Sequence, residues 1–542
     1  MIDLVYLLGI LLFVYAVSKY KHFLWNKKVL IRIRENWGKI PDKQFDLRIA
    51  KDFFKIRSEK FNKDFIDDET WDDLDLNEMF EITNRGITPI GAQYLYFLLR
   101  HPVSKLTILK QRETLINEFS KNQKLREKII LKLMNLRDKN VRYLAYSLWK
   151  PLPDKPKLSF LLTLLSLNAI VILLLVGMKL ISVIYLSVPF VFHMFIRWRV
   201  KRKINEFIVS FQFLGVLIRT AEEISLIKMS EIQDIQKTLK EHLSGTKLIA
   251  DKIFALQFKD EFGLFEYINI YFLFDVSGFY SALNKIRSNI EKLRGLFETI
   301  GHLDAMLSVA SFREEFGNYC CPEFQNKSDL FYVKNIYHPL LKTPVPNSFQ
   351  FESKSTLITG SNMSGKTTFL KTMGVNVVLA QTIFTCLAER YQAPFIRVVS
   401  SIGRSDNLLT GKSYYLAEVE SILKIIKAAD CKEIHLFLID EIFRGTNSVE
   451  RHAVSIEVLN YLANNKDFVM AATHDLQLTE VMNKNYNNFH FREVMNEDGL
   501  GFDYCIHSGP TTSKNAIALL DFVGYPKQIV NSAKKRVKNN LA

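Results

Sequence analysis

The sequence predicts a multidomain protein with membrane-spanning helices, a helical core and a carboxy-terminal α/β domain. Three observations lead to this fold class. The chain has 542 residues, which corresponds to about three or four domains. Two of its regions are apolar over lengths that suit a bilayer. From Phe331 onward, short apolar strands alternate with helices, which is typical of α/β domains.

The first apolar region is Leu4–Val17, which carries no charge and is followed by basic residues between Lys19 and Arg34. A cleaved signal peptide has its positive charge before the apolar run and small residues after it. The reversed order here favours an uncleaved anchor, with its amino terminus outside the cell, over a signal peptide or a buried core helix.

The second apolar region, Leu158–Ile196, divides at residues 177–179 into two runs, each close to the roughly 20 residues that span a bilayer. Both of its outer flanks are basic, which places both on the cytoplasmic side and makes the pair a hairpin. The alternative is a buried helical pair in a soluble core, which the single charge, Lys179, disfavours. We interpret His193 as an interfacial histidine. The three spans predict a multi-pass protein of the cell (inner) membrane with nearly everything else in the cytoplasm.

The remaining composition is that of a folded intracellular protein. Hydrophobic residues make up 48% of the chain and charged residues 24%, which excludes a wholly disordered or low-complexity protein. The 72 basic and 57 acidic residues give a net charge of +15, which favours nucleic acid or an anionic lipid surface as a partner. The five cysteines are too sparse for a disulfide framework or a zinc site, and we expect reduced thiols.

Helical patterns flank the hairpin on both sides. The sequence predicts a helix over residues 46–61, and helical periodicity continues from Leu74 to about Trp149, after which three prolines interrupt it. After the hairpin, residues 204–310 are again mostly helical. Their Lys/Glu-rich faces are typical of solvated helix surfaces.

A buried strand over residues 355–359 runs directly into a phosphate-binding loop. The loop has the pattern Gly-x-x-x-x-Gly-Lys-Thr and is followed by a helix-forming stretch over residues 368–379. In such loops the glycines let the backbone wrap a phosphate, Lys366 reaches the β- and γ-phosphates, and the Thr367 hydroxyl ligates magnesium. Strand, loop and helix in this order predict a nucleotide site. Its residues are Gly360, Ser361, Asn362, Met363, Ser364, Gly365, Lys366, Thr367 and Thr368.

Two further strands end in residues suited to the same chemistry. The apolar strand 435–439 is followed by Asp440, which we expect to hold magnesium, and by Glu441, which we expect to polarise the attacking water. The alternative for this pair is a strand-end acidic pair at the surface. The strand 468–472 leads to His474, which we expect to contact the γ-phosphate, with a structural cap as the alternative.

In this order, the motifs resemble those of the MutS family of mismatch-repair ATPases, in its short membrane-associated bacterial branch. The loop at 360–367 has the family's Asn–Met pair, and residues 440–447 resemble its Walker B motif and D-loop. Residues 401–408, with Gly411, Ser413 and Glu418, resemble the segment that reaches the neighbouring subunit's nucleotide. The similarity continues outside this region. Residues 84–95 are similar to the opening of the family's helical core, and residues 303–324 are similar to its end. Residues 335–339 are similar to the entry to the family's ATPase.

The resemblance implies an ATP hydrolase that uses ATP and Mg²⁺. The implied fold is a helical core (lever) domain and a P-loop ATPase of the ABC type with a mainly parallel β-sheet. It also implies a homodimer through the ATPase domains, in which Ser413 of one subunit approaches the other's γ-phosphate and Asn447 lines the contact. The segments assigned on this basis are an anchor (1–24), a linker (25–73), helical core (74–157 and 198–330), a membrane hairpin (158–197) and the ATPase (331–542).

The chain also departs from the family pattern. The mismatch-reading domain, with its Phe-x-Glu wedge, has no counterpart, and the hairpin stands where the helical core usually carries a DNA-clamping insertion. Ser364 and Phe443 each replace a glycine of the family. The family's adenine-stacking aromatic has no clear equivalent near Pro344–Asn347, so base recognition is left unassigned.

Two functions remain open from the sequence. The first is a membrane-tethered ATPase that binds DNA in a process related to mismatch repair or recombination. The second is a membrane scaffolding or remodelling ATPase with no DNA role, since much of the positive charge lies beside the apolar spans. A transporter half is disfavoured, because no Leu-Ser-Gly-Gly-Gln signature occurs.

Overall fold

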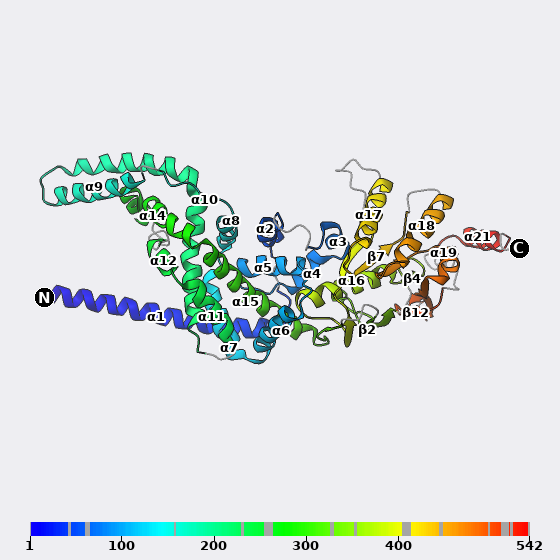
Figure 1. Cartoon of the computed structure of the whole chain (residues 1–542). Coiled ribbons are helices and arrows are strands. Elements are labelled where there is room, and N and C mark those ends of the chain that lie inside the picture. The colour runs from blue at the N-terminus through cyan, green and yellow to red at the C-terminus, as the bar shows by residue number, and fades with distance from the viewer. Residues whose placement is uncertain are drawn as a thin grey trace. The chain divides into compact units, whose positions relative to one another are not determined.

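The chain folds into two compact units (Figure 1). Unit 1 comprises residues 1–62, 82–97 and 114–315, and unit 2 comprises residues 63–81, 98–113 and 316–542. The computed structural model describes residues 2–41, 45–59, 65–156, 159–228, 232–253, 264–325, 330–351, 355–403, 414–443, 448–496, 499–510, 520 and 524–539.

Unit 1 is built from helices. Four helices contain residues of both units: α4 (Leu76–Thr83), α5 (Pro89–Arg100), α6 (Leu106–Lys121) and α15 (Ile290–Phe316), of which only the last residue belongs to unit 2. The other described helices of unit 1 are α1 (Ile2–Asn36), α2 (Leu47–Ser58), α7 (Gln123–Leu133), α8 (Tyr143–Trp149), α9 (Phe160–Gly177), α10 (Ser187–Ser225), α11 (Gln233–Leu243), α12 (Lys247–Ile253), α13 (Leu264–Phe272) and α14 (Phe274–Ser288).

A buried carboxylate joins the two ends of the helical core in unit 1. Asp304 of α15 is fully buried, and its Oδ2 accepts hydrogen bonds from the Thr88 amide at 2.8 Å and the Thr88 hydroxyl at 2.7 Å. The Ile87 amide donates to Asp304 Oδ1 at 2.9 Å. A Cβ at Gly91 would collide with this carboxylate, so the position needs glycine. Two motifs more than 200 residues apart in the sequence therefore meet.

The hairpin region forms α9 and α10, as the apolar runs predict. Among the described residues, two helical segments are long and apolar enough to cross a membrane, Phe160–Gly177 and Val183–Ser225. Many apolar side chains of Phe160–Gly177 and of residues 183–198 are exposed, for example Leu174 at 60% and Ile184 at 70%, whereas those of residues 204–225 are mostly buried. The third predicted span, Leu4–Val17, is not supported as such: it lies within α1, and most of its side chains are outside the described residues. In Figure 1 the hairpin and the amino-terminal end of α1 extend toward the same side.

Unit 2 is an α/β structure with mixed sheets. Its six-stranded sheet has the order β12-β9-β4-β8-β7-β6. Neighbouring strands from β9 to β6 are parallel, and β12 at the edge is antiparallel to β9. The bounds are β4 (Ser355–Thr359), β6 (Arg397–Ser401), β7 (His435–Asp440), β8 (Phe468–Ala472), β9 (Tyr486–His490) and β12 (His507–Ser508). All residues of β4, β7 and β8 are buried, as expected of central parallel strands.

The remaining elements of unit 2 surround this sheet. A mixed sheet has the order β1-β5-β2-β3, and β10 pairs with β11 in an antiparallel ribbon. These strands are β1 (Glu323–Phe324), β2 (Phe331–Ile336), β3 (Asn347–Phe351), β5 (Arg390–Ala393), β10 (Glu493–Asn496) and β11 (Gly499–Phe502). The helices are α3 (Asp68–Asp73), α16 (Lys366–Thr382), α17 (Tyr414–Ala429), α18 (Ser448–Ala463), α19 (Leu476–Val481) and α21 (Lys527–Asn539).

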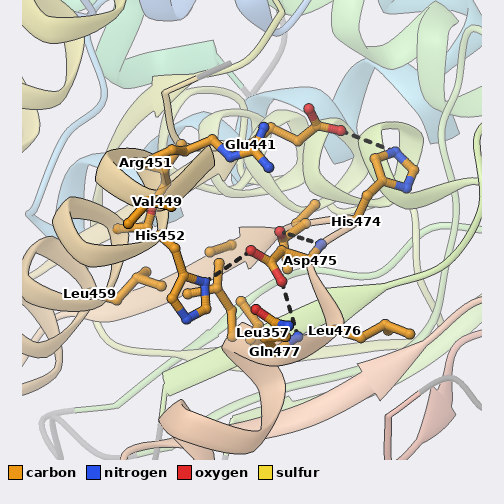
Figure 2. Close-up of a pocket in the computed structure, with 16 residues that line it drawn as sticks. Leu357, Glu441, Val449, Arg451, His452, Leu459, His474, Asp475, Leu476 and Gln477 are labelled. Atoms are coloured by element: carbon orange, nitrogen blue, oxygen red, sulfur yellow. Dashed lines mark hydrogen bonds and ion pairs between the residues drawn. The ribbon is translucent and has the colours of Figure 1, made fainter. Parts of the chain in front are cut away.

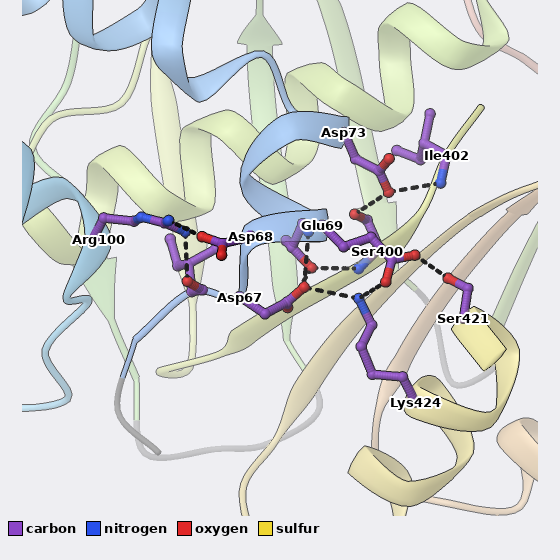
Figure 3. A network of polar contacts seen from close by, with 11 residues as sticks. Asp67, Asp68, Glu69, Asp73, Arg100, Ser400, Ile402, Ser421 and Lys424 are labelled. Atoms are coloured by element: carbon purple, nitrogen blue, oxygen red, sulfur yellow. Dashed lines mark hydrogen bonds and ion pairs between the residues drawn. The ribbon is translucent and has the colours of Figure 1, made fainter. Parts of the chain in front are cut away.

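The acidic helix α3 packs on the edge strand β6, far along the chain (Figure 3). Asp73 Oδ2 accepts hydrogen bonds from the Ser400 hydroxyl at 2.6 Å and the Ile402 amide at 2.8 Å. Lys424 of α17 lies 3.0 Å from Asp67 Oδ1 and 3.1 Å from Glu69 Oε2. These contacts explain why residues 63–81, which the sequence assigns to the linker and the helical core, cluster with unit 2.

Candidate active site

The phosphate-binding loop connects β4 to α16 and has two glycines in left-handed backbone. Gly360 has φ 145°, and a Cβ there would lie 2.7 Å from the Phe491 carbonyl oxygen and 2.8 Å from Ser364 Oγ. Gly365, at the start of α16, has φ 112°. Only glycine adopts these angles without strain. Asn362 and Met363, at the tip of the loop, are exposed.

Lys366 folds back over the loop that precedes it. Its side chain is buried, and Nζ donates hydrogen bonds to the Gly360 carbonyl at 2.8 Å and the Ser361 carbonyl at 2.9 Å. The hydroxyls of Ser361 and Ser364 are buried and have no hydrogen-bond partner in the described structure. A cation beside unsatisfied donors at the amino terminus of a helix fits an anionic oxygen ligand, so a phosphate group suits this loop.

A hydroxyl and a carboxylate meet next to the lysine. The Thr367 hydroxyl donates a 2.6 Å hydrogen bond to Asp440 Oδ2, and Asp440 is buried at the end of β7. Both groups carry the oxygen donors that Mg²⁺ prefers. The pair therefore fits a magnesium ion that is also ligated by phosphate oxygens.

Glu441 and His474 complete the cluster, from the ends of β7 and β8 (Figure 2). His474 Nε2 lies 3.0 Å from Glu441 Oε1 and 3.3 Å from Lys366 Nζ. The Glu441 amide donates to the Ala472 carbonyl at 2.9 Å, and its φ is 58°. A non-glycine residue in this conformation is strained, a feature that concentrates at functional sites.

A cavity of about 620 Å³ opens beside this cluster. Glu441 and His474 lie on one of its sides, and α18 and α19 supply much of the rest (Figure 2). Within it, His452 Nδ1 lies 3.0 Å from Asp475 Oδ2, and Asp475 also caps α19 by accepting from the Gln477 amide. Glu441 is therefore accessible from the cavity, which gives water a route to its carboxylate.

A second cavity, of about 300 Å³, borders the phosphate loop at Gly365 and was not predicted from the sequence. Gly365, Thr368 and Phe369 form its border with the loop, and Tyr504 and His338 line it from elsewhere in unit 2. Burial lowers the pKa of His338 to about 4, so its imidazole is neutral near pH 7. Tyr504 is separated by more than 130 residues from the loop, and no local pattern in the sequence links it to that site.

The structure thus brings together most of the predicted site residues. Lys366, Thr367, Asp440, Glu441 and His474 converge at the carboxyl ends of three parallel strands. Ser413 and Asn447, assigned by resemblance to the subunit contact, lie outside the described residues.

Comparison with known proteins agrees with this geometry. The model of MutS domain V matches residues 356–541. Residues 356–541 are thus similar to domain V of the MutS family, in line with the motifs that they contain. It is similar to the DNA mismatch repair protein MutS of Thermus aquaticus, with 30% identity over 260 residues, and to that of Natronomonas pharaonis, with 27% over 265 residues. These matches cover 47% of the chain but only 31% and 30% of the two relatives, so the chain spans about a third of their length.

The two departures from the MutS glycines have different structural costs. Ser364 is fully buried and its φ is not positive, so a side chain is accepted there without backbone strain. Phe443 has φ 58°, in the left-handed region that favours glycine. Its ring is buried and packs against Tyr415, with ring centroids 6.2 Å apart, which offsets the strain.

Proposed function

We propose that unit 2 binds ATP with Mg²⁺ and hydrolyses it. The observation that carries the proposal is the convergence of Lys366, Thr367, Asp440, Glu441 and His474 around one loop. An anion-binding loop, a pair of oxygen ligands for a cation and a carboxylate accessible to water are the parts that phosphoryl transfer to water requires. The similarity of residues 356–541 to MutS domain V supports the same chemistry.

Each side chain has a distinct role in this proposal. Lys366 exchanges its contacts with the Gly360 and Ser361 carbonyls for phosphate oxygens. Thr367 and Asp440 hold the metal ion, which neutralises charge on the phosphates when it is bound. Glu441 orients water and accepts its proton, and His474, between Glu441 and Lys366, contacts the γ-phosphate.

The base of the nucleotide is assigned to the 300 Å³ cavity. It adjoins Gly365 and Thr368, and the Tyr504 ring offers a surface for stacking. A nucleotide whose phosphates lie in the loop extends from there into this cavity. We further propose that two ATPase units pair around the nucleotides, with Ser413 and Asn447 at the contact.

We propose that α9 and α10 anchor the protein in the inner membrane, with the ATPase in the cytoplasm. We also propose that the protein binds DNA in a mismatch-repair-related process. The exposed apolar side chains of these helices support the anchor, because a surface of this kind is unfavourable in water. The net charge of +15 and the similarity to DNA mismatch repair proteins support DNA as a partner. A scaffolding ATPase without a DNA role remains the alternative, supported by the basic residues beside the hairpin.

The Glu441→Gln variant tests the ATPase proposal. We expect ATP binding to be retained and turnover to fall by at least a hundredfold, because the amide cannot accept the proton of water. Glu457→Gln is the matched control, since Glu457 is exposed on α18 and lies away from the cluster. Binding is measured with a fluorescent ATP analogue and turnover by phosphate release. Normal turnover in Glu441→Gln would show that the carboxylate has another role.

A further inference from the structure

We propose that α13 enters the membrane beside the hairpin as a re-entrant helix, and that the chain leaves the membrane again at the start of α14. The inference rests on the proposed membrane attachment through α9 and α10. The sequence predicts helical core over residues 198–330, with no membrane segment there. The partner of this surface is the acyl region of a lipid bilayer.

The composition of α13 is apolar over a short length. Residues 264–274 read Leu-Phe-Glu-Tyr-Ile-Asn-Ile-Tyr-Phe-Leu-Phe, with Glu266 as the only charge. An apolar run of 10–14 residues is too short to span a bilayer and is typical of a core helix or of a re-entrant or interfacial segment. Exposure decides between these: Tyr267 is 61% exposed, Ile268 39% and Phe274 37%. A core helix would have buried these side chains.

The exposed face of α13 is continuous with that of the hairpin. The helix packs against both α9 and α10. The rings of Tyr267 and Phe190 of α10 stack with centroids 6.4 Å apart. Phe192, two residues further along α10, is 54% exposed. A bilayer that covers the exposed side chains of α10 therefore also reaches α13.

The end of α13 lies within this apolar surface, and polar side chains of the hairpin donate hydrogen bonds to its last carbonyl groups. Leu273, which has φ 53°, separates α13 from α14, so the last carbonyls of α13 lack helical partners. The imidazole Nδ1 of His193 donates to the Tyr271 carbonyl at 2.7 Å, and the Ser166 hydroxyl donates to the Phe272 carbonyl. An unpaired carbonyl costs several kcal/mol in hydrocarbon, so irregular backbone is tolerated there only when protein groups satisfy it. The contacts that a re-entrant turn requires are present.

An ion network fixes where α13 enters and where α14 leaves. Arg197 of α10 donates to Glu266 near the start of α13 at 2.7 Å and to Asp275 at the start of α14 at 2.9 Å. Lys201 lies 3.1 Å from the same Asp275 oxygen. Both ends of the turn are thus held at the level of Arg197, in the basic flank that we place at the cytoplasmic surface. His193 is one helical turn deeper, roughly 6 Å at 1.5 Å per residue.

Tryptophan fluorescence in lipid vesicles tests the proposal on the full-length protein. Three single variants are compared with the parent and its five native tryptophans: Tyr267→Trp in α13, Phe192→Trp in α10, and Tyr461→Trp, which is 43% exposed on α18 of unit 2. The vesicles contain phosphatidylcholine and phosphatidylglycerol with either ordinary or brominated acyl chains. Bromine quenches only tryptophans that contact the acyl region.

We expect the emission added by Tyr267→Trp to be quenched at least twofold by brominated lipid, as for Phe192→Trp, while that of Tyr461→Trp is unchanged. Quenching of Phe192→Trp but not of Tyr267→Trp overturns the re-entrant helix and leaves the membrane anchor in place. Absence of quenching in both overturns the anchor itself. Ile268→Trp gives a second probe of the same face, and retained ATP binding shows that each variant is folded.

Discussion

His338 illustrates how burial at a single residue sets a pH dependence. It lines the 300 Å³ cavity with 5% of its surface exposed, and its Nδ1 accepts a 3.3 Å hydrogen bond from the Leu340 amide. The acceptor role requires the neutral ring. Burial lowers the pKa to about 4; Asp75 opposes this shift, and Lys371 adds to it. The protonated ring is therefore disfavoured in the folded state.

We predict that this histidine destabilises the folded protein in mild acid. The unfolded chain takes up the proton near pH 6.5 and the folded chain only near pH 4, so stability is lost as the pH falls between these values. Keeping the ring neutral over this range destabilises the folded protein by up to about 3 kcal/mol. His338→Asn keeps an acceptor for Leu340 but does not titrate. The drop in melting temperature between pH 7.5 and pH 5 should be smaller in this variant. An unchanged drop would contradict the assignment.

At the scale of elements, the contact between α3 and β6 orients the edge of the sheet (Figure 3). Asp73 binds the Ser400 hydroxyl and the Ile402 amide, and Ser400 N also donates to the Thr70 hydroxyl at 3.2 Å. The chain continues from Ile402 into the segment that resembles the family's inter-subunit loop. A six-residue helix therefore holds the strand that leads to this loop.

We predict that Asp73→Ala lowers both stability and ATPase activity. Removing the carboxylate leaves the Ser400 hydroxyl and the Ile402 amide without their acceptor, at a cost of about 1–3 kcal/mol. Asp72→Ala, on the exposed side of the same helix, is the matched control and should behave like the parent. Thermal unfolding and phosphate release are measured on both variants. Equal behaviour of the two would show that the α3 contact does not stabilise the sheet edge.

The sequence predicts those elements that a local pattern of apolar residues marks, but it does not predict those that depend on contacts between distant residues. Strands β4 and β8 have the predicted bounds, and β7 is one residue longer, because buried central strands read as continuous apolar runs. The burial of α3 on β6 depends on a pairing of residues 327 positions apart. The short apolar run of α13 is ambiguous by itself, since length and composition do not separate a core helix from a membrane segment.

The candidate site likewise combines residues that short sequence motifs predict with residues that only distant contacts bring together. Its phosphate loop and the acids after β7 follow from spacing within short motifs, since strand, loop and helix position them together. The cavity beside Tyr504 is lined by residues from 336–347, from the start of α16 and by Phe491 and Tyr504, so no single segment predicts it. Glu441 and Phe443 adopt left-handed backbone that residue type alone does not indicate.

At the scale of the whole molecule, positive charge has two competing explanations. The net charge of +15 suits DNA, yet part of it lies in the basic flank within α10, just beyond its apolar run, where a membrane protein places basic residues on the cytoplasmic side in any case. Arg199, Arg202 and Lys203 are exposed in this flank. Neutralising them separates the two explanations, because a DNA site elsewhere would not depend on them.

We predict salt-dependent binding of the detergent-solubilised protein to duplex DNA, with ATPase stimulation. Release of counterions from about six phosphate contacts lowers affinity roughly a thousandfold between about 50 and 200 mM salt. Fluorescence anisotropy with matched, mismatched and branched duplexes measures the slope and any preference. The R199Q/R202Q/K203Q variant should keep its DNA affinity and lose affinity for anionic vesicles, since each basic residue near a lipid surface contributes about 1 kcal/mol. No DNA binding at low salt would remove the DNA role and leave the scaffolding ATPase.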